Sequence, residues 1–177
     1  MDRGTPCQPQ WPIIFLDVDD VLVLDRTAAF DKHHVHELAL DFCQRLIHPP
    51  AGLTLMELLQ AFPAKIVVTS NWVRFTSRSA FERLLRLAGY EQVALSLHGV
   101  WSAPGGAAST RVQAIDDWLT DHHRGEPYCV IDDQASGASL VESAHDKAGR
   151  VLLCRVGIGL HRGHLPFIYE ALTTNRP

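Results

Sequence analysis

The sequence predicts an α/β fold built on a mainly parallel sheet of five strands, with helices on both of its faces. Two observations lead to this prediction. Short apolar runs alternate with stretches of helical periodicity along the chain. The clearest runs are apolar at nearly every position, which is typical of parallel strands buried on both sides. Ligands of such sheets bind beyond the carboxyl ends of the strands, so functional side chains are expected there.

The first half of the chain predicts two strands separated by two helices. The strands cover residues 13–18 and 65–70, and both end in polar side chains. The first helix stops at Pro49-Pro50, and the second helix covers residues 54–61. The apolar positions of the first helix recur at helical spacing: Val35, Leu38, Phe42, Leu46 and Ile47.

A helix over residues 81–88 follows the second strand. We expect a short strand at 93–97 and then a loop, because residues 99–110 have the composition of a loop. Ser109 or Thr110 is expected to cap the helix that comes next. The apolar face of that helix consists of Val112, Ile115, Trp118 and Leu119.

The last third of the chain predicts two further strands, at 128–131 and 150–156. A helix over residues 138–147 lies between them, and a final helix covers residues 166–172. These two strands bring the predicted sheet to five.

The composition limits the class of protein. A length of 177 residues suits one domain, so we expect a loose tail over 1–12 and a single domain over 13–177. Hydrophobic residues make up 46% and charged residues 20%, which is ordinary for a globular protein with a sizeable core. The net charge of −4 argues against a nucleic-acid binder held by bulk charge, but it does not exclude a local basic patch.

The cysteines and the apolar runs indicate a compartment. No two cysteines have C-x-x-C spacing, so we expect buried free thiols in a reducing environment. No apolar run approaches the ~20 residues of a membrane span. The N-terminal segment lacks the apolar core of a signal peptide. We therefore expect a cytoplasmic protein that does not insert into a membrane.

Acidic side chains gather at the ends of two predicted strands. Asp17 and Asp19 end the first strand, and Asp132 and Asp133 follow the strand at 128–131. Like charges this close raise each other's pKa unless a cation neutralises them. An all-oxygen site suits Mg²⁺, and Mg²⁺ suits phosphate chemistry. One carboxylate can then be the nucleophile that forms an aspartyl-phosphate, and a second can act as general acid and base.

Each of these signals also has a purely structural interpretation. A lone D-x-D is weak evidence, because motif matches are only hypotheses. The hydroxyls of Thr69 and Ser70 could satisfy loop amides, and Asp132-Asp133 could cap a helix. The joint pattern is stronger, because all three polar pairs follow buried strands within one α/β arrangement.

These residues resemble the motifs of the haloacid dehalogenase (HAD) superfamily. The segments IIFLDVDDVL, IVVTSNW and YCVIDDQ resemble its first, second and fourth motifs. The third motif is normally a Lys or an Arg at the start of a helix, and Arg111 is the candidate. Together with I-x-x-W-L and GIGLHRG, the array over residues 13–172 is similar to the small HAD domain of the Swiss-army-knife RNA repair proteins.

The resemblance implies a HAD-like Rossmannoid three-layer sandwich with a minimal cap or none, and a Mg²⁺-dependent phosphatase. Asp17 would be the nucleophile, and Asp19 the general acid and base. Thr69 would hydrogen-bond the phosphoryl group, and Arg111 would offset its charge. The metal ligands would be Asp17, Asp19 through its backbone carbonyl, Asp132 and Asp133. The substrate-binding side chains beside the second motif would be Ser70, Asn71 and Arg74.

Three positions depart from the family pattern. Asp20 stands where Gly is common, Arg111 replaces the commoner Lys, and His161 stands where a small hydroxyl residue is expected. Arg cannot give up its proton, but it binds phosphate through a planar fork, so the electrostatic role can be kept. Arg74 and Arg78 are the alternatives for the third motif.

The active site is expected to be open, because residues 20–64 leave room for little more than two short helices between the first two motifs. An open site suits a nucleic-acid end, a phosphoprotein, or a small substrate enclosed by a partner subunit. The resemblance favours phosphorylated nucleotide or RNA ends. Trp72 could stack on a base, although packing is the more frequent role. The histidines lack the frame of a zinc site, which favours capping or solvated roles.

Two rival functions stay open. The chain could be a catalytically weak HAD-like module that binds a phosphorylated ligand or a protein partner. It could also be a receiver-like phospho-acceptor domain, which uses acidic strand ends, a hydroxyl residue and Mg²⁺. That class needs its acid pair near the N-terminus, whereas Asp132-Asp133 come late in this chain, so we rank it last.

Overall fold

The computed structural model describes residues 10–24, 40–103 and 109–174. Most of the predicted tail over 1–12 therefore lies outside the described residues. The elements in chain order are β1 (Ile13–Leu16), α1 (Leu40–Leu46), α2 (Pro49–Ala61), β2 (Lys65–Val68), η2 (Asn71–Arg74), α3 (Arg78–Leu87), α4 (Glu91–Leu95), β3 (Leu97–Ser102), α5 (Arg111–His122), β4 (Tyr128–Asp133), η3 (Ala138–Leu140), α6 (Ala144–Lys147), β5 (Val151–Cys154), η4 (Arg162–His164) and α7 (Leu165–Thr173).

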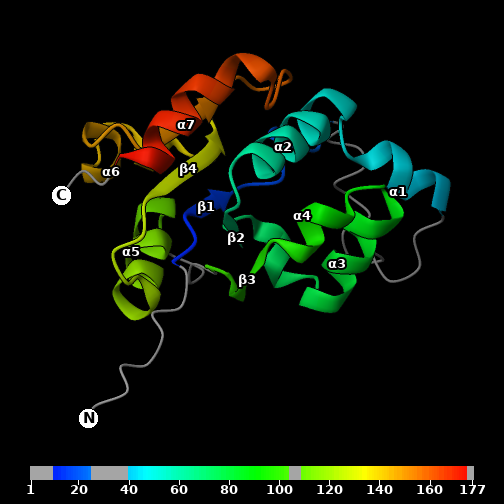
Figure 1. Ribbon diagram of the computed structural model, residues 1–177, viewed down its shortest axis with the longest axis horizontal. Coiled ribbons are helices and arrows are strands. Elements are labelled where there is room, and N and C mark those ends of the chain that lie inside the picture. Colours follow the sequence, from blue (N-terminus) through cyan, green and yellow to red (C-terminus); the bar gives the residue numbers. More distant parts are fainter. Residues whose placement is uncertain (1–9, 25–39, 104–108, 175–177) are drawn as a thin grey trace, which may run out of the picture.

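The five strands form one sheet in the order β3-β2-β1-β4-β5, and every pair of neighbours is parallel (Figure 1). β1 is central, and Ile13 lies opposite Lys65 of β2 on one side and Tyr128 of β4 on the other. Parallel strands point the same way, so the carboxyl ends of β2, β1 and β4 meet at one edge of the sheet. The predicted α/β fold class is confirmed.

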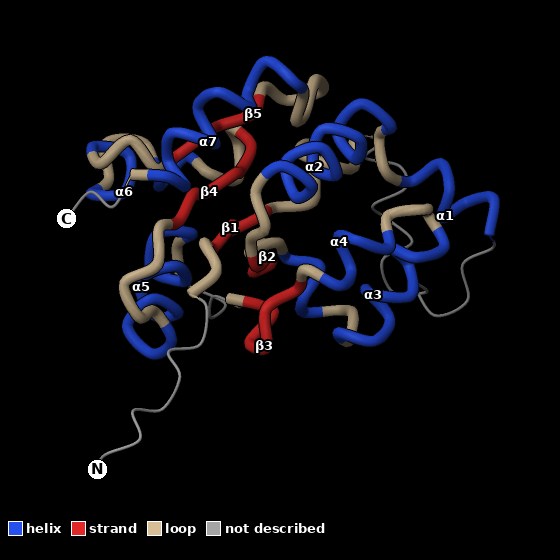
Figure 2. The backbone as a smooth tube through the Cα atoms, viewed as in Figure 1, coloured by secondary structure: helices blue, strands red, loops and turns tan. Residues whose placement is uncertain are grey.

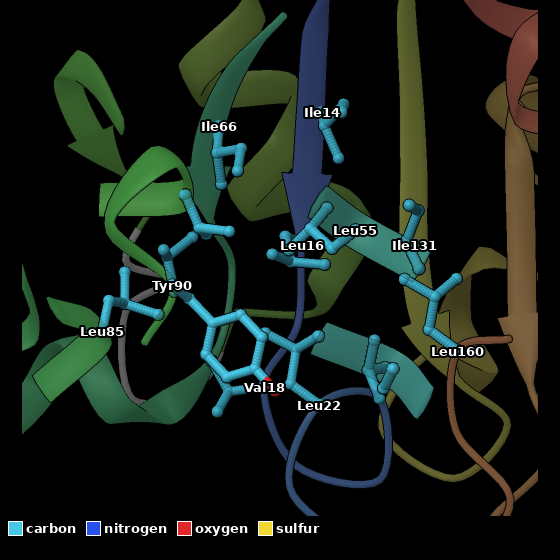
Figure 3. Close-up of a cluster of buried hydrophobic side chains, with 14 of the residues drawn as sticks. Ile14, Leu16, Val18, Leu22, Leu55, Ile66, Leu85, Tyr90, Ile131 and Leu160 are labelled. Atoms are coloured by element: carbon cyan, nitrogen blue, oxygen red, sulfur yellow. The ribbon is translucent and has the colours of Figure 1, made fainter. Parts of the chain in front are cut away.

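Alternate residues of β1 pack against helices on opposite faces of the sheet, and Figure 2 shows the strands between these helices. Ile14 and Leu16 belong to the larger core, which includes residues of α1, α2, α3, α4 and α7 (Figure 3). Ile13 and Phe15 belong to the smaller core, where the rings of Phe15 and Trp118 of α5 meet edge to face at 5.3 Å. A strand that is apolar at every position is thus covered on both sides, as expected.

The described helices are short, and α2 has 13 residues. None of them combines the length and the hydrophobicity that crossing a lipid bilayer requires.

The Pro49-Pro50 pair separates two helices and also begins the second. α1 ends at Leu46, before the prolines, as predicted. α2 begins at Pro49, so the predicted start at 54 is wrong. Proline fits the first turn because the first N–H groups of a helix have no partner within it. Val35 and Leu38, which the prediction placed in the first helix, lie outside the described residues.

The strand predicted at 93–97 is wrong, because α4 covers Glu91–Leu95. An apolar run this short fits a helix or a strand equally well. The strand comes next, and β3 occupies part of the segment predicted as a loop over 99–110. It lies at the edge of the sheet and most of its side chains are at least partly exposed, so the apolar signature is missing. The buried residues of α4 and its N-cap lie at helical spacing: Tyr90, Val93 and Ala94.

The helix predicted over 138–147 is divided in two. η3 ends at Leu140, and α6 begins at Ala144. Between them Glu142 has a φ of 59°, in the left-handed region that interrupts a right-handed helix. The Ser143 side chain then caps α6 by accepting a backbone N–H of its first turn.

Gly52→Ala is expected to destabilise the protein. A Cβ at Gly52 of α2 would overlap the ring of Tyr90, which is buried between α2 and the start of α4 (Figure 3). Overpacking costs about 1–3 kcal/mol, whereas the higher helix propensity of Ala returns at most about 1 kcal/mol. Chemical denaturation should therefore show a lower free energy of unfolding.

Gly99→Ala is the control, because nothing lies within 4 Å of a Cβ at that position. The double variant Gly52→Ala/Tyr90→Leu should be less destabilised than the sum of its single changes. Full stability of Gly52→Ala would contradict the close packing of Tyr90 on α2.

Candidate active site

Three carboxylates lie together at the carboxyl edge of the sheet, where β1 and β4 end side by side (Figure 1). Asp17 follows β1, and its backbone N–H donates to the carbonyl of Ile131 in β4 at 2.9 Å. Asp132 and Asp133 are the last residues of β4. All three aspartates are at most 1% exposed, and they offer oxygen atoms within 4.8 Å of one another. The structure thus gathers three of the four acids that the sequence singled out.

Arg111 is the first residue of α5, and its guanidinium contacts two of these carboxylates. Its Nη2 lies 3.4 Å from Oδ1 of Asp17, and its Nε lies 2.7 Å from Oδ2 of Asp132. The second contact is an ion pair without hydrogen-bond geometry. Thr110, one of the two caps that the sequence suggested, begins the helix with a capping box. The cap fixes the end of α5 and therefore the position of Arg111.

Burial makes the carboxyl groups of Asp17 and Asp132 hard to ionise by raising the pKa of each. It raises the pKa of Asp17 to about 6, against the lowering effect of the Arg111 charge. Burial and the negative charge of Asp17 together raise the pKa of Asp132 to about 8, and the Arg111 charge again opposes this shift. One guanidinium does not balance three buried carboxylates. The cluster therefore holds a proton near neutral pH unless a further cation is present.

The carboxylate cluster fits a divalent cation. Oδ2 of Asp17 is buried and has no hydrogen-bond partner. Oδ1 of Asp132 accepts the backbone N–H of Asp133 at 2.8 Å. Oδ1 of Asp133 accepts the backbone N–H groups of Ala135 and Ser136 at 2.7 and 3.1 Å. These bonds hold two carboxylates in place. The second oxygen of Asp132 also contacts Arg111. Hard carboxylate oxygens of this kind suit Mg²⁺.

Asp19 stands apart from this cluster, in a tight turn after β1. The backbone N–H groups of Leu22 and Val23 both donate to the carbonyl of Val18 at 2.9 Å. Asp19 is half-buried, and its Oδ1 accepts a hydrogen bond from Nε1 of Trp72 at 2.9 Å. This bond restrains the orientation of the Asp19 carboxyl group.

The backbone conformation of Asp20, the next residue, accounts for the Gly that is common at this position in similar proteins. Asp20 has a φ of 54°, a left-handed conformation that Asp tolerates better than most residues. Its Oδ1 accepts the backbone N–H of Gly157 at 3.2 Å, and Leu160 donates its N–H to the carbonyl of Val21 at 3.0 Å. The loop after β5 therefore supports the turn that carries Asp19.

Trp72 is a core residue. It is 2% exposed, so its ring is not available to stack on a base, and the packing role that the sequence favoured is confirmed. It belongs to η2, whose first turn is capped by the Ser70 hydroxyl accepting the Trp72 backbone N–H at 3.4 Å. The ring is therefore held between the core and Asp19.

A pocket of about 360 Å³ lies beside the carboxylate cluster and shares Arg111 with it. Thr69 lines this pocket, and its hydroxyl oxygen is buried without a hydrogen-bond partner. The three side chains that the sequence suggested for substrate binding also line it: Ser70, Asn71 and Arg74. The rest of the lining consists of Val73, Ser109, Thr110, Ala114, Ser136 and Ser139.

Sequence reasoning did not predict that four hydroxyl residues, Ser109, Thr110, Ser136 and Ser139, would line this pocket. Ser109 and Thr110 precede Arg111 and were considered only as helix caps. Ser136 and Ser139 lie shortly after the acids of β4. Their proximity to motif residues in the chain was the available signal, but hydroxyl residues are common in loops and the signal is weak.

Arg78, an alternative for the third motif, lies in other contacts. Its Nε pairs with Glu82 at 2.8 Å, and its Nη1 donates to the carbonyls of His98 and Gly99 at 3.0 Å. These bonds tie α3 to β3. Arg74, the second alternative, lines the pocket, whereas Arg111 contacts the acids.

His161 takes a capping role at the start of η4. Its Nδ1 accepts the backbone N–H of Gly163 at 3.2 Å, and its ring lies 3.7 Å from the ring of His164. Across the three described ranges, the aspartate cluster is the one group of side chains close enough to share a metal ion. Neither histidine belongs to it.

The metal-free protein is expected to become more stable as the pH falls from about 8 toward 4. Asp17 and Asp132 bind a proton more tightly in the folded protein than in the unfolded chain, where their pKa is 3.8. The folded state therefore holds more protons within this window, so stability decreases as the pH rises through it. Denaturation in the presence of a chelator measures the slope.

Asp132→Asn should flatten this slope, because it removes the group with the larger shift. Saturating Mg²⁺ should raise stability at pH 8 more than at pH 5, since protons compete with the cation. A metal-free stability that rises with pH across the window would refute the charge balance described here.

The comparisons with known proteins identify the family. The family model described as the HAD domain in Swiss Army Knife RNA repair proteins matches residues 13–165, which is most of the chain. The searches of curated proteins and of solved structures found no match to the chain. The resemblance inferred from the strand-end motifs is confirmed. The chain belongs to the family of HAD domains found in Swiss Army Knife RNA repair proteins.

Proposed function

We propose that this protein is a Mg²⁺-dependent phosphatase that acts through an aspartyl-phosphate on Asp17. Family membership supports a HAD-type phosphohydrolase in general. One observation carries the finer proposal: three buried carboxylates lie together at the carboxyl edge of the sheet, and the guanidinium of Arg111 contacts two of them. Such a site needs a further cation, and a pocket with phosphate-binding donors opens beside it.

In the proposed reaction an oxygen of Asp17 attacks the phosphorus atom, and the bond between phosphorus and the leaving oxygen breaks. Asp19 donates a proton to that oxygen as it leaves. Water then attacks the phosphorus of the aspartyl-phosphate, Asp19 takes a proton from the water, and the bond to Asp17 breaks. The products are an alcohol and inorganic phosphate, and both aspartates return to their starting states.

The surrounding side chains support these roles. The unpartnered Thr69 hydroxyl would donate to a phosphoryl oxygen, and Arg111 would offset the phosphoryl charge. Asp19 lies outside the cluster, where its orientation is restrained by Trp72, as suits a group that exchanges protons with the leaving oxygen. The remainder of the substrate would contact Ser70, Asn71 and Arg74 in the pocket.

Mg²⁺ would be held by Asp17, Asp132 and Asp133, together with the backbone carbonyl of Asp19. Bound there, it would supply positive charge that neutralises the phosphoryl oxygens. The buried, unpartnered oxygen of Asp17 is the feature of this chain that supports the assignment.

We place the substrate among phosphorylated nucleotides and nucleic-acid ends, in line with the RNA repair proteins that define the family. We place the protein in the cytoplasm, not attached to a membrane. The three cysteines within the described residues, Cys43, Cys129 and Cys154, are buried free thiols, which suits a reducing compartment.

Phosphate release tests the proposal. Wild-type protein should release phosphate from an aryl phosphate and from a phosphorylated oligonucleotide when Mg²⁺ is present. Asp17→Asn should lower kcat by more than about 10³-fold, because it removes the nucleophile. Asp121→Asn, which changes an exposed aspartate near the end of α5, is the matched control and should keep full activity.

Loss of activity in Asp17→Asn with a retained circular dichroism spectrum would support the nucleophile. Wild-type protein that binds Mg²⁺ but releases no phosphate from any substrate would instead favour a binding module.

The leaving group tests Asp19 and its bond to Trp72. Asp19→Asn should lower kcat about 10²–10⁴-fold on an alkyl phosphate. The loss should be smaller on a nitrophenyl phosphate, whose leaving group departs without a proton. Trp72→Phe removes the hydrogen bond but keeps most of the buried ring, so it should show the same selectivity with a smaller loss. An equal loss on both substrates would mean that Trp72 has only a packing role.

A further inference from the structure

We infer that the pocket beside the carboxylate cluster binds a second phosphate of the substrate, and that it recognises a phosphorylated sugar without reading a base. This inference rests on the proposed phosphatase function and narrows its substrate class. The ligand chemistry is a sugar that carries the reacting phosphate and another phosphate close to it.

The pocket is large enough for more than the reacting phosphoryl group. Its volume of about 360 Å³ is within the range of small-molecule sites. Thr69 and Arg111, which we assign to the reacting phosphoryl group, belong to one part of the lining. The remaining lining comes from η2, the start of α5 and the segment after β4, so the pocket extends beyond the reacting group.

The charged side chains in the described lining of the pocket are positive. Among the residues that the structure describes, two arginines and no carboxylate line the pocket. Arg111 contacts Asp17 and Asp132, and we assign it to the reacting phosphoryl group. Arg74 is exposed at the pocket and forms no ion pair with the described part of the chain. In a chain of net charge −4 this leaves Arg74 as the cation for a second anion.

Hydroxyl groups make up much of the polar lining of the pocket. Ser109, Thr110, Ser136 and Ser139 come from two separate segments of the chain and meet at this pocket. A hydroxyl both donates and accepts hydrogen bonds, so it suits phosphate oxygens and sugar hydroxyls alike. The backbone N–H of Ser136 donates to Asp133, which ties this wall to the carboxylate cluster.

Aromatic rings are absent from the described lining of the pocket. Among the described residues no aromatic side chain lines the pocket, and the apolar part of the lining consists of Val73 and Ala114. Trp72 is buried behind η2 and bonded to Asp19. Base recognition in single strands relies on stacking against aromatic faces. Within the described lining such stacking finds no aromatic face, so we assign the recognition to the phosphates and the sugar.

The experiment compares a ribonucleoside 3′,5′-bisphosphate with the two corresponding monophosphates, using the full chain and saturating Mg²⁺. The wild-type protein should have a kcat/KM for the bisphosphate at least tenfold above that for either monophosphate. Arg74→Gln should lower this selectivity ratio about tenfold, because a hydrogen-bonded charge pair is lost. Arg83→Gln, an exposed arginine of α3 outside the pocket lining, is the matched control and should keep the ratio.

Ser139→Glu provides an independent variant, because it places a negative charge in the lining and should lower the same ratio. A wild-type ratio near one, or an unchanged ratio in both pocket variants, would overturn the inference.

Two further substrates separate the components of the ligand. A ribose bisphosphate that lacks a base should react within a few-fold of the nucleoside bisphosphate, and a loss larger than tenfold would overturn base-independent recognition. A phosphorylated dinucleotide with an internal phosphodiester distinguishes a nucleic-acid end from a free bisphosphate. Either preference is compatible with the shared chemistry, provided that Arg74→Gln lowers it.

The failure of this inference is distinguishable from the failure of the proposed function. Aryl phosphate turnover that depends on Asp17, without any selectivity for a second phosphate, would overturn only the subsite. If no substrate is turned over, calorimetric binding of the bisphosphate to wild-type protein and Arg74→Gln tests the subsite alone. Weaker binding by Arg74→Gln would support it, and equal affinity would overturn it.

Discussion

The burial of three carboxylates at one edge of a parallel sheet is the constraint on which the site depends. Asp17, Asp132 and Asp133 are almost fully removed from solvent, and burial of an uncompensated charge is costly. Arg111 offsets part of that cost through its contacts with two of them. The N-terminus of α5 must therefore lie at this edge, and the capping box on Thr110 fixes it there. The residual negative charge is what makes the site suited to a divalent cation.

The sheet holds this cluster through backbone bonds rather than through the side chains themselves. The N–H of Asp17 donates to Ile131, and the N–H of Thr69 donates to Leu16, both at 2.9 Å. These two bonds extend the ladders of β1 with β4 and with β2 by one residue. Because β1 is covered on both faces, its end has little freedom to move. Asp17 and Thr69 therefore keep a fixed separation, as the nucleophile and the hydrogen-bond donor of the proposed mechanism require.

In the proposed mechanism, different side chains serve charge balance, proton transfer and recognition. The buried cluster balances charge between the acids and Arg111. Asp19 is held outside it by a neutral donor, the Trp72 ring, which adds no charge to the balance. The described lining of the pocket presents hydroxyls and Arg74 and includes no acid, so the carboxylate cluster lies beside the pocket rather than in its wall. This separation limits repulsion between the acids and an anionic substrate.

Much of the fold follows from local sequence patterns. β1, β2 and β4 are apolar at nearly every position because both of their faces are covered, and such runs are recognisable without a structure. The predictions were wrong for the elements that are less buried or very short. β3 is an edge strand whose side chains are mostly at least partly exposed, and α4 is too short for its period to be distinguished from that of a strand. The break at Glu142 depends on one left-handed residue that no apolar pattern marks.

The sequence by itself determined the order of the acidic strand ends and the family, because both are carried by contiguous motifs. Only the tertiary structure decided which side chains meet. Trp72 bonds to Asp19 across 53 positions of the chain, and Arg111 reaches acids on two strands. The pocket joins segments that share no local pattern. Contacts of this kind arise from the packing of helices on the sheet, and residue spacing along the chain does not encode them.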